Sequence, residues 1–230
     1  MKKLILLVIS LALVTGTYVI VTYAQDQEPQ YKYEVKSMNN IHSETERKAY
    51  QKALDKALQT LSIPEGYELK EVRSGIQNKS EVWIFRYEKS NGENNGLKGE
   101  HYSFTVNKEN NKILGFSWMD QRFESSEKLL SKKQTEKIAK SFLNRIEPGL
   151  FDRLENLWIR PHDEVITVDG QQMTVTGMKF KCYLSDEDTY AWVIIGPDEK
   201  IITFEQGIKW ESGRKTEKWL HDSWLENTIN

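Results

Sequence analysis

The sequence predicts an α+β protein made of two tandem repeats, each a helix packed on an antiparallel β-meander, behind an N-terminal hydrophobic helix. Residues 102–116 and 190–204 both have the pattern of strand, polar turn and strand, and they align at an offset of 88 residues without a gap. Amphipathic helical stretches begin at Ser43 and Ser131, at the same offset. An apolar run without formal charges precedes both repeats.

The first element is this apolar run, residues 4–24, which directly follows Lys2 and Lys3. Positive charges followed by an apolar run are typical of a secretory signal. The run is also long enough to span a bilayer as a helix, with its positive end in the cytoplasm. We therefore predict an extracytoplasmic protein in which residues 1–24 are either a cleaved signal peptide or a retained membrane anchor.

The first predicted repeat occupies residues 43–119 and follows a polar tether at residues 25–42. Ser43 and Glu46 have the spacing of a capping box, in which a hydroxyl cap is followed by a glutamate three residues later. An apolar stripe at helical spacing then indicates a helix that ends near a Pro/Gly pair. The strands of this repeat are expected at residues 68–73 and 82–87 and in the hairpin at 102–116.

The second predicted repeat occupies residues 131–210 and follows a charged linker at residues 120–130. Ser131 and Gln134 again have the spacing of a capping box. The strands are expected at residues 157–160, 164–168, 173–176 and 178–184 and in the hairpin at 190–204, with a type I′ turn at Asp169 and Gly170.

The last segment, residues 211–230, is predicted to form a Trp-rich C-terminal helix capped by Thr216. Its aromatic face has two interpretations. It either docks on the second sheet and completes that core, or it forms a contact patch for a protein partner or the membrane interface, where Trp is favoured. On the second interpretation, Trp210, Trp219 and Trp224 are the candidate partner-binding residues.

Composition narrows the class of function. The 230 residues carry 32 Lys and Arg against 34 Asp and Glu, a net charge of −2, so that no positive field favours binding to nucleic acid. The single cysteine, Cys182, excludes a disulfide framework and lies in an alternating run that is typical of a core strand. Seven Trp and 11% aromatic residues are enough to build a core.

The sequence offers no motif for catalysis, metal binding or a cofactor. The four histidines do not stand three or four residues apart, so that no helical metal pair exists. There is no G-x-S-x-G elbow, phosphate-binding glycine loop or dinucleotide fingerprint. We therefore predict no catalytic, metal or cofactor residues, although a Ser/His/Asp set assembled from distant positions stays an alternative.

The helix SKKQTEKIAKSFL and the hairpin YSFTVNKENNKILGFSW resemble the PepSY-like repeats of exported Gram-positive proteins, above all the family with YcdB/YcdC-type repeated domains. The resemblance covers most of residues 43–210 in two copies. It departs from the family pattern in the final turn of each repeat. The family favours Asp and Gly there, whereas this sequence has NKENN at residues 107–111 and PDE at residues 197–199. The resemblance implies an extracytoplasmic protein, and PepSY modules are proposed to restrain peptidases. The tandem build is also similar to that of beta-lactamase inhibitor protein.

Together these features predict an exported, non-catalytic protein-binding module that inhibits or regulates a peptidase at the cell envelope. The expected partners are a protein and, if residues 4–24 are not cleaved, the membrane; neither nucleic acid nor a cofactor is expected. Two alternatives stay open: an extracytoplasmic hydrolase with a dispersed site, and a structural protein of the envelope.

Overall fold

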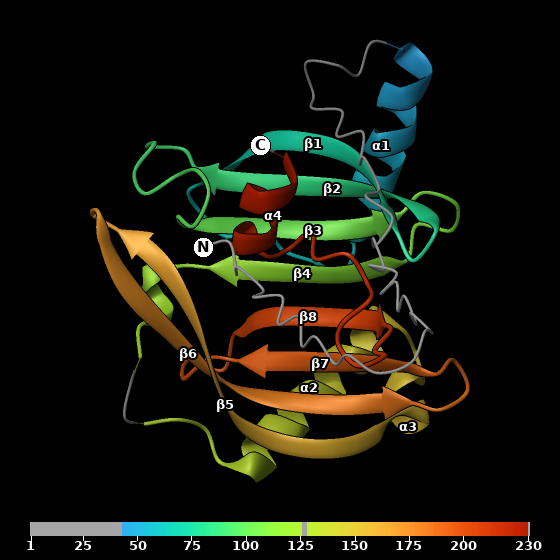
Figure 1. The fold of residues 1–230 in the computed structure, drawn as a ribbon, viewed down its shortest axis with the longest axis vertical. Helices are drawn as coiled ribbons and strands as arrows, with labels where there is room; N and C mark the ends of the chain where they lie inside the picture. Colours follow the sequence, from blue (N-terminus) through green and yellow to red (C-terminus); the bar gives the residue numbers. More distant parts are fainter. Residues whose placement is uncertain (1–42, 126–127, 230) are drawn as a thin grey trace, which may run out of the picture. The chain divides into compact units, whose positions relative to one another are not determined.

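A computed structural model describes residues 43–125 and 128–229. Its eight strands form a single antiparallel sheet in the order β1-β2-β3-β4-β8-β7-β6-β5 (Figure 1). The first meander consists of β1 (Tyr67–Gln77), β2 (Ser80–Lys89), β3 (His101–Asn107) and β4 (Ile113–Met119). The second consists of β5 (Glu155–Val168), β6 (Gln171–Leu184), β7 (Thr189–Ile195) and β8 (Ile201–Ile208).

This single sheet corrects the predicted fold class of two tandem repeats, each with a helix packed on its own antiparallel meander. The last strands of the two meanders, β4 and β8, pair with each other and join everything into one sheet. The register pairs Gly115 with Glu205, Phe116 with Phe204 and Ser117 with Thr203. Each of these strands would otherwise end its meander as an edge with unpaired backbone groups, and pairing them satisfies both. Hydrophobic alternation in a sequence shows which face of a strand is buried, but it does not show which other strand will pair with that strand.

The helices also differ from the predicted arrangement. They are α1 (Glu44–Ala57), α2 (Lys132–Ile146), α3 (Leu150–Arg153) and α4 (Asp222–Ile229), with a short 3₁₀ helix, η2 (Gln121–Phe123). Helix α2 packs across β5, β6 and β7, and its buried residues include Phe142 and Leu143. Helix α1 buries mainly small side chains, Ala53 and Ala57, besides Leu54. The two helices therefore do not cover their meanders equivalently. The predicted N-terminal hydrophobic helix and the tether at 25–42 lie outside the described residues.

Local signals in the sequence are confirmed. The hydroxyl of Ser43 accepts a hydrogen bond from the Glu46 amide, and Ser131 and Gln134 form a reciprocal capping box. Asp169 and Gly170 both have positive φ, 50° and 76°, as the type I′ turn between β5 and β6 requires. The linker predicted at residues 120–130 contains η2 and the fully buried Phe123. The proposed domain boundaries stay predictions.

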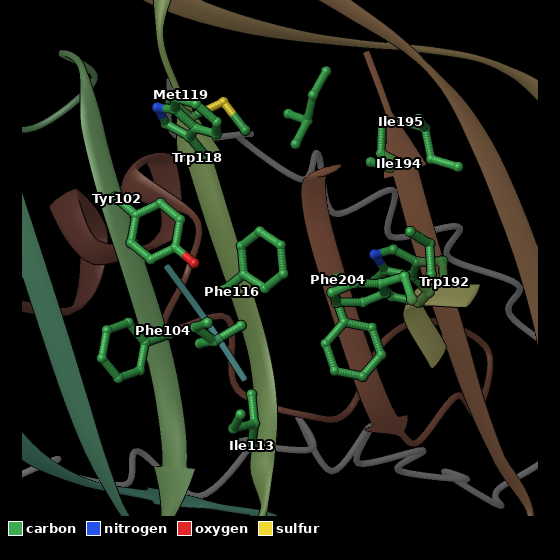
Figure 2. Close-up of a cluster of buried hydrophobic side chains, with 14 of the residues drawn as sticks. Tyr102, Phe104, Ile113, Phe116, Trp118, Met119, Trp192, Ile194, Ile195 and Phe204 are labelled. Atoms are coloured by element: carbon green, nitrogen blue, oxygen red, sulfur yellow. The ribbon is translucent and has the colours of Figure 1, made fainter. Parts of the chain in front are cut away.

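The two faces of the sheet are covered differently. The face toward α1 and α2 carries the large apolar core, to which Phe85 belongs. Figure 2 shows Phe104, Phe116 and Phe204 of this core. The opposite face of the first meander is covered by the C-terminal segment, whose Trp219 packs with Val82 and Ile84. Two glycines make room for this segment. A Cβ on Gly75 would lie 2.7 Å from the Trp219 ring, and one on Gly115 would lie 2.9 Å from Leu220.

The C-terminal helix is shorter than predicted. Helix α4 begins only at Asp222, and Thr216 lies in an irregular stretch before it. The Thr216 hydroxyl donates to Asn78 Oδ1 at 2.7 Å and accepts from the Lys209 amide at 2.8 Å. Thr216 therefore does not cap a helix. Its hydroxyl ties the C-terminal segment to the β1–β2 turn.

Candidate functional site

A groove of about 1150 Å³ lies on the helix-bearing face of the sheet. Its walls are the connection that follows α1 (residues 59–67), strands β3 and β4, helix α2 and the start of β8. Helix α2 packs mainly over β5 to β7. It also reaches the β4–β8 seam through Phe142, whose ring meets Phe116 on β4 and Phe204 on β8. The groove thus lies where the two meanders meet in one sheet, and both halves of the chain contribute residues to its walls.

Aromatic side chains line the floor of the groove. Tyr102 on β3 and Phe116 on β4 stack at 5.5 Å between ring centroids, and Phe142 of α2 meets Phe116 edge-on at 5.7 Å. Trp118 lies two residues beyond Phe116 on the same face of β4, as strand alternation requires (Figure 2). All four rings are largely buried, so the floor is held in place before any ligand arrives.

The rim of the groove carries three exposed cations, Arg122, Arg145 and Lys200, which we call the rim cations. The Arg122 guanidinium lies 5.0 Å from the Trp118 ring and that of Arg145 lies 5.4 Å from the Phe142 ring. Within the described residues, no side chain of the rim cations forms a hydrogen bond or ion pair with a carboxylate. Their charge is therefore available to a ligand.

Other polar groups in the groove are already engaged. Asp120 accepts hydrogen bonds from the Tyr67 hydroxyl at 2.7 Å and from the Arg122 amide at 2.9 Å. Lys89 forms an ion pair with Glu100 at 2.7 Å. Burial, and after it the contact with Asp120, raises the pKa of Tyr67 far above its usual range. At neutral pH this hydroxyl is therefore a neutral donor.

The floor has one further hydroxyl, that of Tyr102. Burial raises the pKa of Tyr102 well above its usual range, although the charge of Arg145 acts in the opposite direction. Tyr102 therefore stays neutral at physiological pH. The acidic side chains on the groove are Glu65 and Asp120, and the first of these is exposed to solvent. An anionic ligand would meet more positive than negative charge here.

Among the described residues that line the groove there is no histidine or cysteine. In the described ranges, no group of three or more His, Cys, Asp or Glu side chains is arranged to hold a metal ion. Nor does any helix of residues 43–125 and 128–229 have the length and apolar character needed to cross a membrane.

The structure does not bring the three candidate tryptophans into one exposed patch. Trp219 is only 2% exposed, donates its indole N–H to the Ile76 carbonyl at 2.8 Å and meets Trp224 edge-on at 5.0 Å. Trp210 is 48% exposed and lies against Tyr190 instead, with 6.4 Å between the ring centroids. Partner binding by these tryptophans stays a prediction, for which Trp210 offers the most accessible ring.

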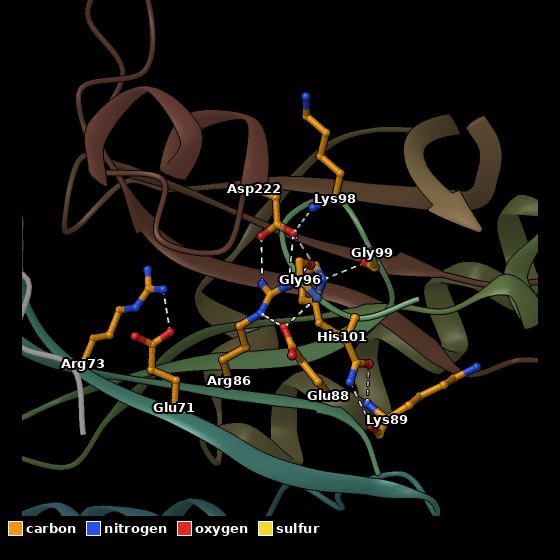
Figure 3. Close-up of polar contacts among 11 residues, drawn as sticks. Glu71, Arg73, Arg86, Glu88, Lys89, Gly96, Lys98, Gly99, His101 and Asp222 are labelled. Atoms are coloured by element: carbon orange, nitrogen blue, oxygen red, sulfur yellow. Dashed lines mark hydrogen bonds and ion pairs between the residues drawn. The ribbon is translucent and has the colours of Figure 1, made fainter. Parts of the chain in front are cut away.

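Sequence reasoning missed a buried charge network at the start of α4 (Figure 3). Arg86 on β2 forms ion pairs with Asp222 at 2.9 Å and Glu88 at 2.8 Å. The same Asp222 carboxylate accepts the Lys98 amide at 2.7 Å and lies 3.6 Å from His101. Burial, followed by the charge of Arg86, lowers the pKa of His101 to about 4. This network fixes α4 to the β2–β3 connection. A signal was visible in the run VWIFRY, where a lone arginine interrupts an apolar strand.

The fold defines an α+β protein built on one eight-stranded antiparallel sheet, with a cationic aromatic groove at its seam. The chain belongs to the YcdB, YcdC repeated domain family, whose model matches residues 50–175, from within α1 to within β6. The resemblance to this family is thereby confirmed. Neither a curated protein nor a solved structure matches the chain.

Proposed function

We propose that the protein is an exported, non-catalytic binding module that holds an acidic segment of a protein partner in the groove. The observation that carries this proposal is the combination of a preformed aromatic floor with three rim cations that have no carboxylate partner in the described part of the chain. The rings expose little surface, so charge and hydrogen bonding would supply most of the recognition.

A peptidase is the partner that we favour, because the resemblance to PepSY-like modules implies a role in restraining such enzymes. Export is proposed from residues 1–24, whose pattern is that of a signal peptide or an anchor. Together these proposals describe an inhibitor or regulator that acts at the cell envelope.

The direct test measures binding of two peptides to the full chain by calorimetry. One is acetyl-Glu-Phe-Glu-Phe-Glu-amide, and the other replaces each Glu by Lys. We expect only the acidic peptide to bind, with an affinity that falls as salt rises. The triple variant R122Q/R145Q/K200Q should bind about threefold to 150-fold more weakly, since each rim charge pair contributes roughly 0.2–1 kcal/mol.

The matched control is K52Q/K132Q/K133Q, which removes the same charge from exposed positions on α1 and at the start of α2. Equal binding by the two triple variants would exclude the groove as the site. The peptidase proposal is tested with the full chain as bait for secreted and membrane peptidases of the native host. An inhibited stoichiometric complex supports it, and capture of none of them contradicts it.

A further inference from the structure

A second cationic cluster lies on the opposite face of the sheet, on the β5–β6 edge hairpin. It consists of Arg160, Lys179 and Lys181, which we call the edge cations. The register pairs Arg160 with Lys179, and Lys179 and Lys181 share a face because they lie two residues apart on β6. Across the sheet, Lys181 pairs with Trp192 on β7, Trp192 pairs with Glu205 on β8, and Glu205 pairs with Gly115 on β4. Gly115 directly precedes Phe116, which lines the groove. Adjacent residues of a strand point to opposite faces, so this cluster lies on the side of the sheet away from the groove.

Aromatic rings surround the edge cations. The Lys181 ammonium lies 4.9 Å from the centroids of both Tyr190 and Trp210 and 5.6 Å from that of Trp158. The Lys179 ammonium lies 4.2 Å from the Trp192 ring. Trp210 is among the most exposed large apolar side chains of the described chain, and its accessible surface is available to another ring.

The carboxylates of this face have hydrogen-bond or ion-pair partners other than the edge cations. Glu205 forms an ion pair with Arg214 at 2.6 Å and a contact with His221 at 3.2 Å. Although burial opposes its ionisation, these two groups hold the pKa of Glu205 at about 2. Glu164 contacts His162 at 3.0 Å. In the described residues, none of the edge cations has a side-chain hydrogen bond or ion pair with a carboxylate. Glu205 and Glu164 do favour the charged form of Lys179 through space, so the unmatched positive charge of this face is carried mainly by Arg160 and Lys181.

The geometry points to a ligand with several anionic groups. Cross-strand neighbours stand about 5 Å apart at Cβ, and residues two apart on a strand stand about 7 Å apart. Cations spaced in this way can each pair with a different anionic group, as the successive phosphates of a polymer would allow. Arg214, whose planar fork suits carboxylates, is already bound to Glu205. Two of the three edge cations are lysines, which act as point charges toward phosphate.

We propose that this face binds a phosphate-bearing sugar polymer, with phosphates on the edge cations and a sugar ring packed on Trp210. The site is separate from the groove in its residues and in its face of the sheet. If this face does not bind such a polymer, the function proposed for the groove is unaffected. If the groove does not bind an acidic segment, the proposal for this face is likewise unaffected.

The test measures binding of phosphomannan to the full chain by biolayer interferometry, with unphosphorylated mannan and poly-L-glutamate as comparisons. We expect phosphomannan to bind and mannan not to bind. The variant R160Q/K181Q should bind phosphomannan at least tenfold more weakly, and W210A several-fold more weakly. K132Q/K133Q, which loses the same net charge elsewhere, should bind like the wild type. So should the groove variant R122Q/R145Q/K200Q.

Three outcomes would overturn the proposal. One is the absence of phosphomannan binding, and another is an equal loss in R160Q/K181Q and in K132Q/K133Q. The third is poly-L-glutamate binding to the groove variant R122Q/R145Q/K200Q as tightly as phosphomannan does, which would indicate an acidic protein as the occupant of this face.

The protonation of Lys179 gives a readout that is independent of affinity. Burial is the main cause that lowers the pKa of Lys179 to about 8, Lys181 and Arg214 act in the same direction, and Glu205 and Glu164 oppose them. Bound phosphate should raise this pKa, which NMR of the lysine side chain measures. Affinity should fall several-fold from pH 7 to pH 9 as the free amine loses its proton, and K179Q should abolish this dependence. An unchanged Lys179 pKa in the complex would contradict the proposal.

Discussion

The charge network around Arg86 and the rim cations of the groove both contain arginine side chains, but the network is buried and paired whereas the rim cations are exposed and have no carboxylate partner in the described part of the chain. The Arg86 side chain is 8% exposed, and its partners Glu88 and Asp222 are 6% and 7% exposed, so that each charge is buried with an opposite charge. Arg145 in the rim is exposed, and no carboxylate within the described residues pairs with it. A buried cation has to be matched for the fold to be stable, whereas an exposed and unmatched cation is free to bind a ligand. Burial and pairing, rather than residue type, thus separate structural from binding residues here.

The largest expected effect follows from removing one partner of the buried network. D222N leaves the Arg86 guanidinium with part of its charge unmatched and weakens the attachment of α4. Breaking a buried pair in this way costs about 3–5 kcal/mol, which urea denaturation of the full chain measures. The control is D186N, whose partner Arg153 is exposed, and its unfolding midpoint should not move. If D222N were as stable as D186N, the network would not have the structural role that we assign to it.

His101 gives the network a dependence on pH. Because its pKa is about 4 in the folded protein and 6.5 for a histidine in an unstructured peptide, the unfolded chain binds a proton between these values that the folded chain does not bind. Stability is therefore lost as pH falls from about 6.5 toward 4. Between pH 7 and pH 5 the loss should be about 2 kcal/mol.

H101N tests this pH dependence, because its amide keeps a donor for the Gly99 carbonyl but does not titrate. The comparison is the change in unfolding free energy between pH 7 and pH 5 in each protein. We expect a smaller change in H101N than in the wild type. Equal changes would assign the acid sensitivity to other groups.

The sequence predicted the local parts of the fold correctly and the global arrangement wrongly. The caps at Ser43 and Ser131 and the turn at Asp169 and Gly170 depend on neighbouring residues, so that the sequence alone reveals them. The pairing of β4 with β8 depends on which edge strands meet after the chain has collapsed. No local pattern encodes that choice, and two separate sheets would have satisfied the same alternation.

The candidate site was hidden from the sequence for a related reason. Phe116 and Trp118 could be recognised as the apolar face of a strand, which ordinarily predicts core packing. That they also line a groove depends on where α2 lies and on Arg145, which comes from that distant helix. Conversely, Trp219 was conspicuous in the sequence but is buried against β1 and β2. A cluster of aromatic residues in a sequence indicates burial at least as often as binding.

Among these substitutions, we expect a change in the rim cations to affect stability least, in contrast to a change in the network around Arg86. R145Q removes an exposed charge that lies over the Phe142 ring and has no carboxylate partner among the described residues, so the unfolding free energy should change by less than about 0.5 kcal/mol. The same substitution should weaken binding of the acidic peptide and flatten its dependence on salt, because one screened charge pair is lost. A large loss of stability in R145Q, measured by urea denaturation, would mean that Arg145 holds the fold together, as Arg86 does. A small loss accompanied by weaker binding would show that the seam between the two meanders is used for recognition.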